Sequence, residues 1–171
     1  GLEIARSVAD TAIDRRYDDG SFRDGAPDGP GLLDRPLRPL DGNVAMARGL
    51  FELGVLTGID RYRDIAKQTL ASFAGARDRI GVQVAAYGSL TARLLRDPLV
   101  IAVGDAVGSD LHRAACRVAD HEKLVIPNAA DAPSRPKLDV TTGEAIVVGH
   151  ADVAPATSPG ELMQRVAATT E

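Results

Sequence analysis

The chain has 171 residues, of which 44% are apolar and 26% charged, and this balance excludes wholesale disorder and fits one medium domain or two small ones. No apolar run reaches the roughly 18 residues of a membrane span, and a net charge of −4 provides no broad basic surface, so neither a membrane nor a nucleic acid is expected as a partner. The one cysteine, Cys116, excludes an internal disulfide framework and a cysteine-built zinc site, and neither a metal nor a cofactor is expected.

The N-terminal segment predicts an amphipathic helix, a turn and an irregular linker. Within residues 2–17, Ala9 and Ile13 recur at helical spacing. Gly20, in the run DDGSFRDG, suits a turn better than a helix interior. The four prolines in residues 26–41 interrupt both helical and strand hydrogen bonding, which predicts an irregular linker there.

Three further helices are predicted in the first half of the chain. Residues 43–58 are apolar on nearly every face, which is typical of a buried helix. Residues 61–75 carry an apolar stripe, and so few residues separate the two segments that they predict an antiparallel hairpin. The fourth helix is expected over residues 79–96, and Pro98 closes it.

The pattern of apolar residues changes in the second half of the chain, where short β-branched runs typical of strands appear. Two short β-branched runs flank a helix whose N-cap is Ser109 or Asp110, and this order predicts a parallel strand pair joined by a right-handed crossover. A third strand follows a loop, and the capping signal of Ser158, Pro159 and Glu161 opens a last helix. The predicted elements are strands over 99–105, 123–128 and 144–150 and helices over 109–120 and 161–169.

These elements predict an α+β fold in two parts. Residues 1–97 are expected to form α-helical hairpins, and residues 98–171 a small three-stranded α/β unit. The helices predicted over 2–17 and 61–75 are each followed by a glycine-containing break, which suggests a repeated α-hairpin.

The order of segments also resembles a known family. The stretches LEIARSVADTAIDRRYDDGSFRD, GLLDRPLRPLDGNVAMARGLFELGVLTGIDRYRDIAKQTLASF and GEAIVVGHADVAPATSPGELMQRV resemble the C-terminal part of large cytosolic proteins typified by spermatogenesis-associated protein 20. That family joins a thioredoxin-like domain to an (α/α)6 toroid similar to those of six-hairpin glycosidases. The resemblance implies that residues 1–97 are part of such a toroid in a cytoplasmic protein. It also implies that the rest of the parent chain is the partner, and that the parent binds or processes a carbohydrate.

Two departures from the family pattern restrict what the resemblance implies. Of the family's Pro-Ser-Gly-Asn-Ser-like stretch before the buried helix, this chain keeps only Gly42 and Asn43. Two cysteines of the family, near the last strand, correspond here to Val148 and Val153. No redox or metal role is therefore expected for that segment.

Asp41 and Asn43 are the first candidate ligand-binding residues. They stand where the proline-rich linker enters the buried helix. At the mouth of a toroid, their side chains would hold sugar hydroxyls. The alternative interpretation is that they cap the helix, since Asp and Asn are both good N-cap residues.

Tyr17 and Asp24 are the second pair of candidates. With Asp18 and Asp19 they surround a glycine turn, and paired carboxylates near an aromatic ring are the groups that a glycosidase uses as acid and base. Asp-Asp-Gly is also an ordinary turn composition. Catalytic residues are left unassigned, and whether the chain is part of an enzyme is left open.

Cys116 and the histidines are interpreted as structural. Cys116 lies in the helix predicted over 109–120, without an identifiable histidine partner, and is expected to be a small core residue. His112, His121 and His150 lack the spacing of metal ligands and are expected at the surface or in caps.

The sequence thus predicts a non-catalytic C-terminal module of a toroid protein. The alternative is a stand-alone interaction module that forms homo-oligomers, in which the buried helix, 43–57, contributes to a dimer core. An incomplete toroid is expected to expose apolar helix faces, and such faces usually find partners.

Overall fold

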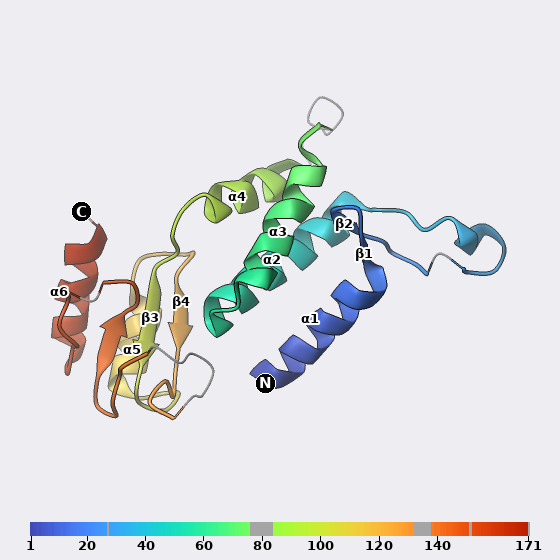
Figure 1. The fold of residues 1–171 in the computed structure, drawn as a ribbon. Coiled ribbons are helices and arrows are strands. Elements are labelled where there is room, and N and C mark those ends of the chain that lie inside the picture. The colour runs from blue at the N-terminus through green and yellow to red at the C-terminus, as the bar shows by residue number, and fades with distance from the viewer. Residues whose placement is uncertain (27, 76–83, 132–137, 151, 171) are drawn as a thin grey trace. The chain divides into compact units, whose positions relative to one another are not determined.

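The computed structural model describes residues 1–26, 28–75, 84–131, 138–150 and 152–170. The chain divides into two compact units, Gly1–Arg96 and Asp97–Glu171. Within the described residues, six α-helices accompany one two-stranded and one three-stranded sheet, which confirms the predicted α+β fold (Figure 1).

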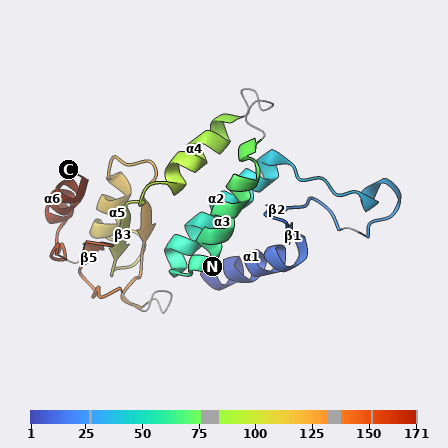
Figure 2. The same ribbon diagram turned by 45° about the horizontal axis from the view of Figure 1, so that its top comes forward.

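The first unit is helical. Its helices are α1 (Leu2–Arg16), α2 (Leu40–Thr57), α3 (Asp60–Ser72) and α4 (Val84–Leu94), with a 3₁₀ turn at Gly31–Asp34. The predicted hairpin is confirmed, because α2 and α3 lie side by side after a two-residue connection (Figures 1 and 2). Gly58 permits this sharp reversal: its φ of 70° is left-handed, and its N–H donates to the carbonyl of Gly54. Residues 79–83 of the predicted fourth helix lie outside the described residues.

The core of the first unit follows the predicted patterns. In α2, the side chains of Ala47, Leu50 and Phe51 are at most 1% exposed. The apolar stripe of α3 faces them, and α1 contributes Ala9 and Ile13. Each of α1, α3 and α4 contacts α2. The helix that the sequence predicts to be buried is therefore the centre of the unit.

A small β-hairpin follows α1. Strands β1 (Tyr17–Asp18) and β2 (Ser21–Phe22) pair antiparallel around Asp19 and Gly20, whose φ values of 48° and 79° are both positive. Positive φ at both central residues is the geometry of a type I′ hairpin turn, for which Asp-Gly is a preferred sequence. The predicted turn is confirmed, but its two strands were not predicted from the sequence.

The second unit contains the three-stranded sheet. Its strands are β3 (Val100–Val103), β4 (Leu124–Ile126) and β5 (Ala145–Val147), in the order β4-β3-β5. The predicted parallel pairing of the first two strands is confirmed, and β5 pairs antiparallel with β3. The unit also contains α5 (Asp110–Arg117) and α6 (Pro159–Thr170).

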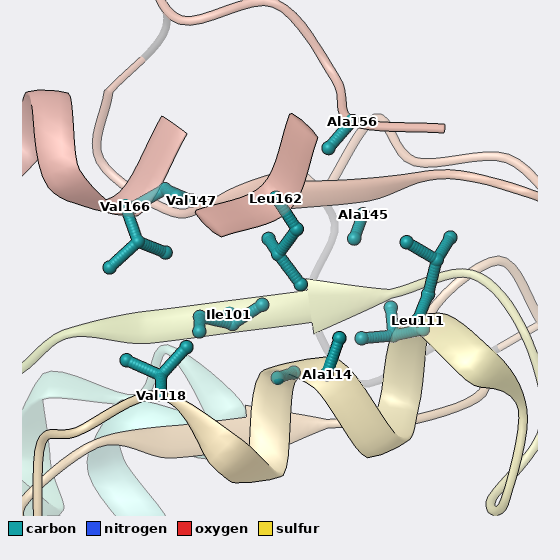
Figure 3. Packing of buried hydrophobic residues seen from close by; sticks show 11 residues of the cluster. Ile101, Leu111, Ala114, Val118, Ala145, Val147, Ala156, Leu162 and Val166 are labelled. Atoms are coloured by element: carbon teal, nitrogen blue, oxygen red, sulfur yellow. The ribbon is translucent and has the colours of Figure 1, made fainter. Parts of the chain in front are cut away.

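Both helices of this unit share one core with the sheet. Figure 3 shows side chains of α5 and α6 gathered around Ile101 of β3. Ile101 and Leu162 are fully buried, and Leu111 is 4% exposed. Burying such side chains provides the main stabilisation of a small unit, about 1.5–3 kcal/mol for each large aliphatic residue.

Serine caps begin both helices. Ser109 Oγ accepts a hydrogen bond from the N–H of His112, and Ser158 Oγ accepts one from the N–H of Glu161. The cap at Ser158 is confirmed, and of the two residues predicted for the other cap the structure selects Ser109. The carboxylate of Glu161 accepts hydrogen bonds from the N–H and hydroxyl of Thr157, and these bonds hold the pKa of Glu161 below its usual value.

None of the described helices combines the length and the apolar character needed to cross a membrane.

Gly104 provides a test of packing in the second unit. A Cβ at this position would lie 1.9 Å from the carbonyl oxygen of Thr141, a backbone atom. We expect Gly104→Ala to destabilise the unit by about 3 kcal/mol or more, because the neighbouring turn must move.

The matched control is Gly160→Ala in the first turn of α6, where a Cβ would meet no atom within 4 Å. This substitution should leave stability unchanged or raise it by up to about 1 kcal/mol. Urea denaturation of both variants checks the prediction, which fails if the two have the same midpoint.

Candidate functional site

The four predicted site residues all belong to the first unit. Tyr17 is in β1, Asp24 follows β2, and Asp41 and Asn43 are in the first turn of α2. The segment between β2 and α2 connects these places. The candidate site therefore consists of the β1–β2 hairpin, residues 23–26 and 28–39, and the start of α2.

Asn43 joins the hairpin to α2. It is 1% exposed, and its side-chain carbonyl accepts a 2.6 Å hydrogen bond from the N–H of Phe22. Its amide donates 2.9 Å hydrogen bonds to the carbonyls of Phe22 and Pro39. The amide group thus pairs with the main chain of Phe22 as a neighbouring strand would, and it satisfies a buried N–H and a carbonyl together.

The capping interpretation of Asp41 and Asn43 is wrong. Helix α2 begins at Leu40, and its N-cap position is occupied by Pro39, which provides no side-chain hydrogen bond. Asp41 is exposed in the first turn, where a carboxylate is favourable to the helix dipole. Proline-rich sequence before the helix sets its start, because the ring fixes φ close to the value that leads into a helix.

Asp18 is the centre of a group of charges on the hairpin. Its carboxylate pairs with Arg23 and, at 2.8 Å, with Arg38. Arg38 also donates to the carbonyl of Asp18 and to the hydroxyl of Ser21. The hydrogen bond and charge of Arg23, with those of Arg38, lower the pKa of Asp18 below its usual value. These contacts tie the hairpin to the segment before α2, a role that the sequence analysis missed.

Tyr17 lies against both the hairpin and α3. Its ring is tilted against that of Phe22, with 5.0 Å between centroids, and its hydroxyl donates a 2.8 Å hydrogen bond to Gln68. Partial burial raises the pKa of the Tyr17 hydroxyl. The ring is half-buried, so one side of it stays accessible to solvent.

Asp24 lines a hollow in the segment between β2 and α2. Its N–H donates to the carbonyl of Leu37, and its carboxylate accepts a 2.7 Å hydrogen bond from the N–H of Leu37. The hollow encloses about 600 Å³, and its walls include Asp24, Gly25, Arg35 and Pro36. On its walls the carboxylate of Asp24 can accept hydrogen bonds from sugar hydroxyls and the guanidinium of Arg35 can donate to them, so this hollow is a candidate ligand site around a predicted residue.

The structure brings only some of the predicted residues together. Asp24 lines the hollow, whereas Tyr17, Asp41 and Asn43 do not. Asn43 and Tyr17 are connected through Phe22, which both of them contact. That these residues hold a sugar stays a prediction, and their observed contacts are with the protein itself.

The interpretation of Cys116 as a core residue is wrong. The buried side of α5 consists of Leu111, Ala114 and Ala115, and Cys116 is exposed. It also has a histidine neighbour one turn away, since His112 Nε2 lies 3.7 Å from its sulfur. His112 Nδ1 accepts a hydrogen bond from the N–H of Gly108, which agrees with the capping role expected for a histidine.

Among the residues that the structure describes, no group of three or more His, Cys, Asp or Glu side chains could hold a metal ion.

No known family model, curated protein or solved structure matches the chain.

Asn43→Ala tests the role of the amide. The substitution leaves the N–H and carbonyl of Phe22 without their partner, and each buried unpaired group costs about 1–3 kcal/mol. We expect a loss of about 2–4 kcal/mol in the free energy of unfolding, measured by urea denaturation. The control, Asp41→Ala, removes an exposed carboxylate two positions away in the same turn and should cost less than about 1 kcal/mol. Equal effects of the two substitutions would contradict the structural role of Asn43.

The ion pairs of Asp18 predict that the stability of the protein depends on pH in the acid range. Because its pKa is lowered in the folded protein, its ion pairs contribute stability above the unfolded pKa of about 3.9. This contribution is lost as pH falls through the lower pKa of the folded state. Asp18→Asn should therefore be less stable than the parent at neutral pH, and the difference should narrow toward about pH 2.

The control for this titration is Asp19→Asn. Asp19 is exposed on the same turn, and asparagine readily adopts its left-handed backbone. Urea midpoints of the three proteins at successive pH values provide the measurement. A difference between Asp18→Asn and the parent that is independent of pH would show that the carboxylate charge is not what matters.

Proposed function

We propose that the chain is a non-catalytic C-terminal module whose α1 packs against further α-hairpins of a longer, toroid-like chain. The observation that carries this proposal is the outer face of α1. Ile4 and Val8 lie one turn apart on this helix and are 70% and 63% exposed. Such a pair is unusual on the outside of a helix that already buries a separate apolar face.

The inner face of α1 is attached firmly. Ala9 and Ile13 are buried, and Asp10 accepts a 2.9 Å hydrogen bond from the hydroxyl of Tyr62 on α3. Burial, together with this hydrogen bond to Asp10, raises the pKa of Tyr62. Arg61, also on α3, lies 3.6 Å from the carboxylate of Asp10. These contacts fix the inner face of α1 against the unit. The outer face, which carries Ile4 and Val8, is therefore directed away from α3.

The outer face of α1 is an open surface that a second helix could pack against. It includes Val8, Thr11, Ala12 and Arg15. These four positions have the spacing i, i+3, i+4 and i+7, which is the set of residues that surrounds a side chain inserted from a neighbouring helix. Small Ala12 and Thr11 side chains allow close approach.

The surroundings of α2 favour this proposal over the alternative dimer. Most large apolar residues of α2 are buried within the chain, Phe51 and Leu50 at 1% exposure or less. A dimer core built on residues 43–57 would have to displace neighbouring elements. The outer face of α1 needs no such rearrangement.

The resemblance of the sequence extends the proposal. It supports a cytoplasmic parent protein with a thioredoxin-like domain, in which the toroid binds or processes a carbohydrate. In that protein the hollow beside Asp24 and Arg35 is the place where this chain would contribute polar contacts to the sugar.

The experiment compares the protein from the full natural reading frame with residues 1–171. If further hairpins pack on α1, its amide hydrogens exchange more slowly in the longer protein. Ile4→Ser combined with Val8→Ser should then destabilise the longer protein by about 2–4 kcal/mol and leave residues 1–171 nearly unchanged.

The control substitution is Leu95→Ser, which alters a side chain in the same unit that is 83% exposed. The proposal is overturned if α1 exchanges equally fast in both proteins, or if the double variant behaves like this control. A dimer of residues 1–171 that the double variant leaves intact, measured by light scattering, would instead support the stand-alone interaction module with residues 43–57 in its core.

A further inference from the structure

We draw no further inference here: the strongest candidate, the exposed Cys116 beside His112 on α5, is a single cysteine for which no second feature of the described residues points to a ligand.

Discussion

The packing of the first unit is determined by α2, because this helix has apolar side chains on almost every side and they must be covered by other elements. A helix with Val44, Leu50, Phe51 and Val55 spread around its axis cannot lie at a surface without exposing a large apolar area. Helices α1, α3 and α4 and strand β2 all contact it. The short α2–α3 connection supplies the first of these neighbours at little entropic cost, because a tight loop leaves few conformations to lose. The remaining sides must be covered by segments more distant in the sequence.

Burial at the start of α2 also requires hydrogen-bond partners for main-chain groups, and Asn43 provides them. The β1–β2 hairpin brings the main chain of Phe22 against the start of α2, where its N–H and carbonyl lose water. One side-chain amide offers a donor and an acceptor in the right geometry, which no apolar residue could do. Arg38 has a similar role on the exposed side of the hairpin, since it donates hydrogen bonds to both the main-chain carbonyl and the carboxylate of Asp18. The polar residues around the hairpin therefore hold an irregular segment in place.

The elements that could be predicted from the sequence are those defined by their own residues. The buried character of α2, the sharp turn at Gly58 and the cap at Ser158 each depend on neighbours within a few positions. The β1–β2 strands are two residues long, too short for any alternation to be read. The partner of Asn43 lies 21 positions away, and nothing in the local pattern identifies it. Cys116 was misplaced because in an eight-residue helix one position, about 100° of rotation, separates it from buried Ala115.

The structural roles of these polar side chains restrict what the candidate site can do. A side chain that holds main-chain groups is a poor catalytic acid or base, because moving its proton or rotating it would release the segment it supports. Asp24 is in this position, because its carboxylate accepts a hydrogen bond from the N–H of Leu37. Asn43 holds the main chain of Phe22 with an amide, which is not an acid or a base in this sense, and the carboxylate of Asp18 is paired with Arg23 and Arg38. Of these three residues only Asp24 lines the hollow, and Arg35 lines it as well. Ile4 and Val8 of α1 are exposed, whereas the polar groups around the hairpin bond to the chain itself, and these two observations are the basis of the proposed role in a larger helical assembly.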